Sequence, residues 1–344
     1  MSGIMALLTI ETTCDETAAA VIDERGNVLG SAIATQEKLH ERFTGVVPEI
    51  ASRAHVERIL PIIDAAMTQS GLKPQDLTAV AVAHTPGLAG SLLVGLVAAK
   101  TLSVAWQKPL VGVNHLHAHL YACQLTSPSA VYPCIGLVVS GGHTSLYHCS
   151  SALDLVYLGG TIDDAAGEAF DKVAAMLRLG FPGGPAVSRL AAGGNAQAYS
   201  FPRSMIHDDH FNFSFSGLKT AVRYAIVGPG KQDFDTVVIA DKVKADICAS
   251  FEAAVIDVIV AKAVRAIRKF EVGQLCVGGG VAANRKLRAC LDLAAKQHGF
   301  QLTVAAPELC TDNAVMGAIA WEKIRRGEFA NLELDIEPGL QRGF

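Results

Sequence analysis

Charged residues are scarce in this sequence of 344 residues, and neither sign of charge dominates. They make up 18% of the chain, and 29 Lys and Arg against 33 Asp and Glu leave a net charge of −4. This composition excludes a disordered chain, a coiled coil and a basic nucleic-acid tail. We therefore do not expect the isolated chain to bind DNA or RNA tightly through charge alone.

Targeting signals and paired cysteines are also missing. The first twenty residues contain neither a basic segment nor a long apolar run, so we expect no secretory signal. The apolar runs at 91–100 and 135–141 are too short to span a bilayer. The eight cysteines are scattered, without a CxxC pair or zinc-finger spacing, which favours the reducing cytoplasm.

Half of the residues are hydrophobic, and the length suits about two domains. Apolar runs at 7–10, at 18–22 and from residue 28 are separated by polar turns, which predicts three antiparallel strands. Helices and strands are then expected to alternate as follows: a helix at 48–70, a strand at 79–84, a helix at 88–106, a strand at 110–114 and a helix from 115.

The same pattern of three strands, helices and further strands begins again after residue 130. The expected strands are 135–139, 145–149, 153–158, 275–277 and 302–305; the expected helices are 165–179, 185–193, 236–270, 281–298 and 312–326. A polar, aromatic-bearing segment at 195–235 resembles an insertion. We predict an α/β protein with an N-terminal lobe at 1–130, a C-terminal lobe at 131–344 and a ligand cleft between them. The actin-like, sugar-kinase-type ATPase fold is built in this way, with two polar turns that hold a nucleotide's phosphates.

Three histidines lie within five residues, directly after an expected strand. Helical positions i and i+4 share a face, so His115 and His119 can bind one metal ion, whereas His117 points elsewhere. A metal needs a third ligand, for which Asp312 is a candidate, although a helix cap explains Asp312 equally well. Surface histidines at a helix start are the simpler alternative. A zinc protease would need Glu where Leu116 stands, so it would lack its general base.

Three glycine-rich segments in the second half end strands or begin helices. Ser140-Gly141-Gly142 lets backbone N–H groups approach an anion, although a hairpin turn explains it as well. Gly278-Gly279-Gly280 is expected to open a helix and to bind a sugar-phosphate, with Asn284 nearby for a purine or ribose. The third segment is 182–185.

Acidic residues gather in two places. The pair at 163–164 can cap a helix, whereas Asp171 lies deeper in that helix and could bind a ribose diol. The first polar turn carries Glu11, Asp15 and Glu16, which would repel a bare phosphate unless a metal intervened. This arrangement indicates acyl or phosphoryl chemistry.

Nine segments, in order along nearly the whole chain to about residue 326, resemble the TsaD family. Its members are tRNA threonylcarbamoyladenosine biosynthesis transferases, once described as O-sialoglycoprotein endopeptidases. The chain's length and its lack of a fused kinase are similar to the bacterial form. The matching segments are 9–17, 45–55, 86–95, 114–119, 139–144, 163–172, 213–220, 278–285 and 310–313.

The resemblance implies a two-lobed actin-like acyltransferase. It would move a threonylcarbamoyl group from threonylcarbamoyl-AMP to the exocyclic amine of the adenosine adjacent to the anticodon, in tRNAs reading codons that begin with A. It implies one divalent metal, Fe²⁺ or alternatively Zn²⁺, held by His115, His119 and Asp312. We hypothesise that Asp15 or Glu16 accepts the amine proton or orients the substrate. The implied contacts to the adenylate are Val138, Val139, Ser140, Gly141, Gly142, Asp171, Gly184 and Asn284.

The resemblance also implies partners: tRNA, a smaller actin-like paralogue of the TsaB type on the N-terminal lobe, an ATPase subunit of the TsaE type and a separate synthase. No DNA or membrane is expected, and the location is cytoplasmic. Because the net charge is −4, we expect weak, salt-sensitive tRNA binding by this chain alone. Partners would help to hold the RNA, as would the basic clusters at 265–269, 285–288 and 323–326.

Two positions depart from the family pattern, and two other functions stay open. His117 stands where the family usually has Glu, and His84 where it commonly has a small residue. A metal-dependent (glyco)peptidase is the first alternative, and Leu116 counts against it. A catalytically silent nucleotide-binding subunit is the second, and it would be expected to lose the three metal-ligating side chains.

Overall fold

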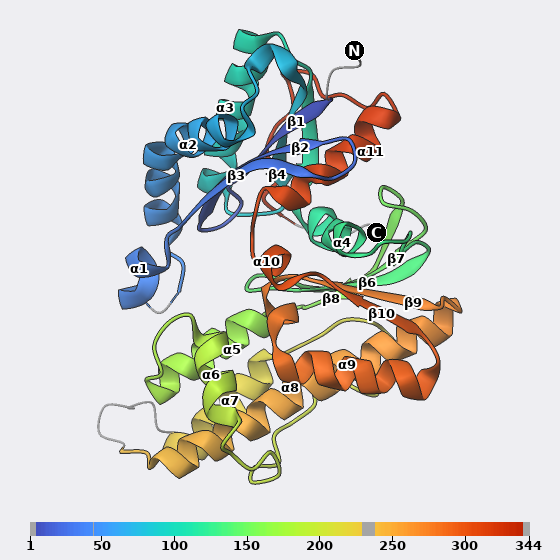
Figure 1. Ribbon diagram of the computed structural model, residues 1–344. Coiled ribbons are helices and arrows are strands. Elements are labelled where there is room, and N and C mark those ends of the chain that lie inside the picture. The colour runs from blue at the N-terminus through green and yellow to red at the C-terminus, as the bar shows by residue number, and fades with distance from the viewer. Residues whose placement is uncertain (1–4, 44, 229–237, 340–344) are drawn as a thin grey trace.

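The computed structural model describes residues 5–43, 45–228 and 238–339. Two five-stranded sheets lie one above the other in Figure 1, and helices cover their outer faces. The first sheet has the order β3-β2-β1-β4-β5, and the second has the order β10-β9-β6-β7-β8. The strands of the first sheet are β1 (Ala6–Glu11), β2 (Glu16–Asp23), β3 (Val28–Thr35), β4 (Leu77–Thr85) and β5 (Leu110–Asn114). Those of the second are β6 (Cys134–Val139), β7 (Thr144–Cys149), β8 (Leu155–Gly160), β9 (Gln274–Gly278) and β10 (Gln301–Val304).

The two sheets have the same pairing pattern. In the first, β1-β2 and β2-β3 are antiparallel, whereas β1-β4 and β4-β5 are parallel. In the second, β6-β7 and β7-β8 are antiparallel, whereas β6-β9 and β9-β10 are parallel. The duplicated α/β architecture predicted from the sequence is therefore confirmed.

The helices divide between outer faces and the space between the sheets. α2 and α3 cover the outer face of the first sheet, where they contact β2, β3 and β4. α4 lies between the two sheets in Figure 1, and one hydrophobic core joins its buried residues to both of them. The helices are α1 (Glu37–His40), α2 (Pro48–Ser70), α3 (Ala89–Trp106), α4 (His115–Thr126), α5 (Ala166–Leu177), α6 (Gly183–Ala191), α7 (Ser216–Val227), α8 (Asp241–Phe270), α9 (Arg285–His298), α10 (Pro307–Cys310) and α11 (Ala320–Arg325).

Among the described helices, α3 alone is long and apolar enough to cross a membrane by length and composition. A core helix can meet the same criteria, and α3 contacts both β4 and α2. A third of its residues are buried, so much of its apolar surface lies on the outside of the first lobe.

Several helix boundaries differ from the expected ones. The helix expected from 281 begins at Arg285, because Asn284 caps it by accepting the N–H of Leu287 at 2.9 Å. The helix expected at 312–326 divides into a 3₁₀ turn at Val315–Ile319 and α11. The expected insertion contains α7 from residue 216. Residues 229–237, which include its end and the expected start of the next helix, lie outside the described residues.

The C-terminal segment returns to the first sheet. Lys323 donates a hydrogen bond to the carbonyl of Gly112 in β5 at 2.8 Å, and Ala330 forms an antiparallel bridge with Leu110. Further along, the N–H of Glu337 donates to the carbonyl of His84 at 3.0 Å. The first sheet is therefore completed by residues from the far end of the chain, and a lobe boundary near residue 130 stays a prediction.

Candidate active site

Asn114 determines where the histidine-bearing helix begins. Its Oδ1 accepts the N–H groups of Leu116 at 2.9 Å and His117 at 3.1 Å, which makes it the N-cap of α4. His115 and His119 then lie one turn apart on the same face, with ring centroids 4.5 Å apart.

Asp312 joins these two histidines from the segment between α10 and the turn at Val315–Ile319. Its Oδ1 lies 3.0 Å from Nε2 of His119 and 3.6 Å from Nε2 of His115. One ligand atom from each of the three side chains lies within 4.8 Å of the others, and no second such group occurs in the part of the chain that the structure describes. Two imidazoles and a carboxylate that leave coordination positions open are typical of catalytic divalent metal sites.

Glu11, at the end of β1, orients the ring of His115. Its Oε2 lies 3.1 Å from Nδ1 of His115, and its Oε1 accepts the N–H of Thr13 at 2.7 Å. A carboxylate at Nδ1 keeps the ring proton there and leaves the Nε2 lone pair facing His119 and Asp312. From the sequence, Glu11 was only one acid in a polar turn, and its contact with His115 spans 104 positions.

The charges of this cluster stabilise one another strongly. Burial lowers the pKa of His115, but the carboxylates of Glu11 and Asp312 raise it to about 9. Burial raises the pKa of Asp312, but His115 and His119 hold it well below its usual range. The cluster is therefore built to hold additional positive charge, which either protons or a metal ion can supply.

The turn between β1 and β2 places its acids near the same cluster. Asp15 is 9% exposed, and Glu16 begins β2. Burial raises the pKa of Glu16 well above its usual value, and the carboxylates of Asp312 and Asp15 raise it further. Glu16 thus lies within electrostatic range of both Asp312 and Asp15.

The Ser-Gly-Gly turn follows β6, whose last two residues, 138–139, are buried. The N–H of Ser140 donates to the carbonyl of His143 at 2.7 Å, and Oγ of Ser140 accepts the N–H of His143 at 3.2 Å. Gly141 and Gly142 are exposed, with open space where a side chain would stand. Burial lowers the pKa of His143, and the positive charges of His115 and His119 lower it further, to about 4. The turn therefore lies beside the metal-ligand cluster.

Asp171 faces the start of α6. Its Oδ1 accepts the N–H of Gly183 at 2.8 Å, and no atom lies within 4 Å of where a side chain on Gly184 would stand. Burial raises the pKa of Asp171 to about 6, although the N–H groups of both glycines oppose the rise. Asp171 is therefore a carboxylate whose charge changes just below neutral pH.

Asn284 is more fully engaged than the sequence indicated. Besides capping α9, its Nδ2 donates to Oγ of Ser188 and to Oε1 of Glu252, both at 2.8 Å. Ser188 also donates to Glu252 at 2.7 Å. Both N–H groups of the amide are thus used within the protein, and only its oxygen has capacity left for a ligand. Sequence reasoning missed Glu252, because nothing distinguishes it from other acids on α8.

Gly278 lets β9 approach α4, and Gly279 lets the following turn approach β6. A side chain on Gly278 would place its Cβ 2.2 Å from the carbonyl oxygen of His119, and one on Gly279 would place it 2.4 Å from that of Val139. Gly279 also has a φ of +96°, which L side chains rarely adopt. Only Gly280 faces open space. The expectation that this segment binds a sugar-phosphate stays a prediction, and the first two glycines also have a packing role.

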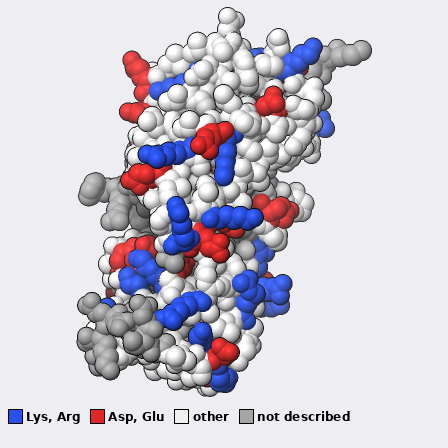
Figure 2. Space-filling model, turned by 90° about the vertical axis from the view of Figure 1, so that its left-hand side faces the viewer, with Lys and Arg blue, Asp and Glu red and all other residues white. Residues whose placement is uncertain are grey.

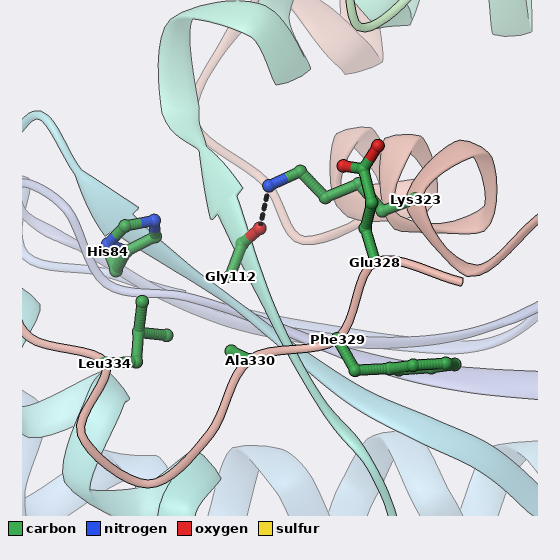
Figure 3. A pocket seen from close by; sticks show the side chains of 7 residues that line it. All are labelled: His84, Gly112, Lys323, Glu328, Phe329, Ala330 and Leu334. Carbon is green, nitrogen blue, oxygen red and sulfur yellow. Dashed lines mark hydrogen bonds between the residues drawn. The ribbon is translucent and has the colours of Figure 1, made fainter. Parts of the chain in front are cut away.

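The two positions that depart from the family pattern lie away from the metal cluster. His117 packs edge-on against Tyr147, with ring centroids 5.9 Å apart. Nδ1 of His84 lies 3.1 Å from the carbonyl oxygen of Asp335, and this hydrogen bond fixes the C-terminal segment against β4. Figure 3 shows the pocket of about 120 Å³ beside it, lined by His84, Gly112, Lys323, Glu328, Phe329, Ala330 and Leu334.

Most residues of the three basic clusters make hydrogen bonds within the protein. Arg265 donates to carbonyls of the loop before α7, Arg288 to those of Ala282 and Ala305, and Arg326 to Asp154. Figure 2 shows Lys and Arg interspersed with Asp and Glu, without a large patch of one sign on this face. Arg265 and Arg288 donate to neutral carbonyls and keep their positive charge, whereas Arg326 is paired with Asp154. Weak tRNA binding by the isolated chain stays a prediction.

The Glu11→Gln variant is expected to bind a divalent metal about 10–100-fold more weakly, because it removes the carboxylate that orients His115. Titration against a chelator of known affinity measures this directly. Glu57→Gln, at an exposed position on α2, is the matched control and should bind like the unaltered protein. Equal metal affinity in the Glu11→Gln variant would contradict the role assigned to this carboxylate.

Solved structures with the same two-lobed arrangement define the class of protein. Full-length HypF in its phosphate- and nucleotide-bound form matches 96% of this chain and 57% of its own, with a TM-score of 0.61 at 14% identity. Component A of (R)-2-hydroxyglutaryl-CoA dehydratase from Acidaminococcus fermentans matches 93% of this chain and 99% of its own, with a TM-score of 0.54 at 13% identity. At these identities the likeness shows the fold alone, which is the actin-like ATPase fold.

The family follows from more similar sequences. The model of the TsaD family, tRNA N6-adenosine threonylcarbamoyltransferase, matches residues 27–319. Relatives with that same name are 67% identical over 349 residues in Rhodopirellula baltica and 45% identical over 342 residues in Bacillus subtilis. The match covers 98% of both chains for the first, and 98% of this chain and 96% of the relative for the second. The chain belongs to the TsaD family and is a transferase; the resemblance found in its motifs is confirmed.

Proposed function

We propose that the chain transfers a threonylcarbamoyl group from threonylcarbamoyl-AMP to N6 of the adenosine next to the anticodon, in tRNAs that read codons beginning with A. The bond between the carbamoyl carbon and the phosphate oxygen breaks, a bond to N6 forms, AMP leaves and the amine releases one proton. The observation that carries this proposal is the gathering of a metal-ligand set, an acidic turn and an exposed Gly-Gly turn around one point.

The donor set at this point fits one divalent metal ion. Two buried imidazoles and one carboxylate suit Fe²⁺ or Zn²⁺, and Glu11 supplies the hydrogen bond that commonly orients a metal-bound histidine. We propose that His115, His119 and Asp312 hold Fe²⁺, with Zn²⁺ as the competing assignment. When bound, such an ion polarises the carbamoyl carbonyl as a Lewis acid.

The remaining residues of the site bind and orient the adenylate. Gly141 and Gly142 offer backbone N–H groups to the phosphate and leave room for its close approach. The N–H of Ser140 already donates to the carbonyl of His143, so Ser140 shapes this turn rather than donating from its backbone. Asp171 accepts hydrogen bonds from the ribose hydroxyls, beside the open space at Gly184. On the side of α9, the free lone pair of the Asn284 amide oxygen accepts a hydrogen bond from the base or ribose. Val138 and Val139 are fully buried and support the Ser-Gly-Gly turn that follows them.

The acidic turn receives the proton of the adenosine amine. An adenine amine is a poor nucleophile, so positioning and activation of the carbonyl matter more than a strong base. Glu16 suits the role of proton acceptor because burial and its carboxylate neighbours raise its pKa. Asp15, beside it, orients the amine.

The proposal is tested by incubating the purified chain, loaded with Fe²⁺, with preformed threonylcarbamoyl-AMP and unmodified tRNA. Mass spectrometry of the tRNA nucleosides is expected to show threonylcarbamoyladenosine, with AMP released in equal amount. Cleavage of a glycoprotein that depends on metal and on His119, with no modified nucleoside, would instead support the peptidase. Leu116 occupies the position of a zinc protease's general base and is buried, which disfavours that outcome.

Binding of adenosine, which carries no phosphate, is expected to weaken as the pH falls through the pKa of Asp171, about 6. The carboxylate accepts ribose hydroxyls when ionised, so affinity is full above this pH and is lost below it. Affinity is expected to be about tenfold lower at pH 5 than at pH 8. Equilibrium dialysis measures it. The Asp171→Asn variant should bind weakly and without this pH dependence; an equally flat profile in the unaltered protein would exclude Asp171.

We propose that the smaller actin-like paralogue docks on α2 and α3 of the first lobe. Val56 and Leu60 of α2 and Val97 of α3 are each more than half exposed, and a groove of about 590 Å³ runs between the two helices. This apolar surface suits the helices of a related lobe. We also propose that the chain acts in the cytoplasm together with an ATPase subunit and a separate synthase that supplies threonylcarbamoyl-AMP.

A further inference from the structure

The acidic turn joins β1 to β2 and carries Asp15 and Glu16, and its backbone accepts hydrogen bonds from side chains of α2 and α3. The carbonyl of Cys14 accepts two hydrogen bonds, from Nε2 of His55 on α2 at 3.0 Å and from Oγ of Ser91 on α3 at 3.1 Å. The preceding carbonyl, of Thr13, accepts the N–H of Leu88 at 2.8 Å. Both lone pairs of the Cys14 oxygen are therefore occupied, at the residue directly before Asp15.

The ring of His55 has one tautomer that satisfies all of its contacts. A carbonyl can only accept, so Nε2 carries the proton, and Nδ1 accepts the hydroxyl of Thr17 at 2.8 Å. The ring is fully buried, and burial lowers its pKa below the usual value, so it stays neutral near pH 7. Because Cys14 and Thr17 lie on either side of Asp15 and Glu16, one side chain holds both ends of the acidic segment.

Such a restraint has a physical reason in the charges nearby. Thr13 and Glu11, at the start of the turn, each lie 3.1 Å from Nδ1 of His115, which places the turn beside the cluster. Burial raises the pKa of Glu16, and the carboxylates of Asp312 and Asp15 raise it further. Like charges at short range repel, and the repulsion would displace an unrestrained turn from the cluster. A neutral, fully hydrogen-bonded imidazole opposes that displacement without adding charge of its own.

We infer that His55 is a positioning residue for the transfer reaction: it fixes the turn that carries Asp15 and Glu16 beside His115, His119 and Asp312. It does not touch the substrate. The inference rests on the proposed catalytic role of the acidic turn, and the experiment below separates the position of the turn from that role.

Two substitutions test the two ring nitrogens separately. Gln can place its terminal N–H near Nε2 and keep the bond to Cys14, although it loses the acceptor for Thr17. Asn reaches only the Nδ1 position, so it keeps that acceptor and loses the bond to Cys14, which is the bond that holds the residue next to Asp15. We expect His55→Asn to lower kcat about a hundredfold, with KM for tRNA and for threonylcarbamoyl-AMP nearly unchanged, because small misplacements of reacting groups have effects of this size. His55→Gln is expected to stay within about threefold of the unaltered protein.

Alkylation of Cys14 by N-ethylmaleimide reports the position of the turn without reference to catalysis. Cys14 and Cys290 are the two cysteines that are not fully buried, so Cys290 is an internal control in the same peptide map. His55→Asn is expected to speed labelling of Cys14 severalfold and to leave Cys290 unchanged, whereas His55→Gln should change neither. Ser91→Ala, which removes the second donor to Cys14, should change both readouts in the same direction and carries the test should the Asn variant not fold.

Each outcome decides one part of the inference. Unchanged labelling of Cys14 in His55→Asn or Ser91→Ala would show that the turn does not depend on these bonds, whatever happens to kcat, and would overturn the inference. Equal losses in the Gln and Asn variants would do the same, since a purely structural role predicts them. Faster labelling with unchanged kcat would remove the proposed catalytic role of Asp15 and Glu16 and, with it, the catalytic meaning of the restraint.

Discussion

The His119→Ala variant is expected to lose threonylcarbamoyl transfer by about a thousandfold or more, because a Lewis acid supplies several kcal/mol and about 1.4 kcal/mol corresponds to tenfold in rate. His119 is one of three side chains in the metal-ligand set, and its Nε2 lies 3.0 Å from Asp312. Single-turnover rates with preformed threonylcarbamoyl-AMP and tRNA measure the loss. Metal content of the purified variant, determined by mass spectrometry, should fall in parallel.

His117→Ala provides the matched control, two residues away on the same helix. Its ring faces Tyr147 rather than the cluster, and the centroids are 5.9 Å apart. We expect it to keep its metal and to turn over within about threefold of the unaltered protein, as for a substitution outside the reacting groups. Near-normal turnover by His119→Ala without bound metal would contradict the proposed metal role, and an equal loss in both variants would indicate damage to α4.

The metal-ligand set could be predicted because its two histidines follow a local rule. His115 and His119 are spaced one helical turn apart, and Asn114, one of the strongest N-cap residues, determines where the turn begins. The same rule placed His117 on another side of the helix, and the structure has it against Tyr147. Asp312 could be assigned to the set only through its resemblance to the family motif, because an Asp at a helix start is explained equally well as a helix cap.

The residues that support this set could not be predicted, because no local pattern identifies them. Glu11 meets His115 across 104 positions, His55 meets Cys14 across 41, and Glu252 meets Asn284 across 32. Each is an ordinary polar residue at the end of a strand or within a helix. Only tertiary packing reveals that it faces a buried partner.

The fold shows the same division. Apolar runs separated by polar turns predicted both sheets, because strands that are buried on both faces appear in the sequence as short continuous apolar segments. They did not predict that residues after 312 pack on the first sheet, where Thr9 donates to the carbonyl of Ala314 at 2.6 Å. An apolar helix face indicates that another element packs against it, but the sequence does not show which sheet that element belongs to. Gly317 permits this approach, since a Cβ there would lie 2.9 Å from the Cβ of Thr9.

The Gly278→Ala variant is expected to lose both stability and metal affinity. Its new Cβ would stand 2.2 Å from the carbonyl oxygen of His119, so α4 and β9 must separate. Overpacking of this kind costs about 1–3 kcal/mol or more when backbone is the obstacle. The displacement moves His119 relative to Asp312, because Asp312 lies on another segment. Thermal unfolding of the metal-free protein and chelator titration measure the two effects independently.

Gly280→Ala separates packing from ligand binding within the same motif. No atom lies within 4 Å of where its Cβ would stand, so the melting temperature and metal affinity are expected to match the unaltered protein. Weaker binding of AMP to this variant alone would show that the last glycine faces the nucleotide, as the sequence motif first indicated. A loss of stability in Gly280→Ala equal to that in Gly278→Ala would contradict the packing argument, since only one of the two positions is crowded. An unaltered metal affinity in Gly278→Ala would show that the histidines do not depend on the contact between α4 and β9.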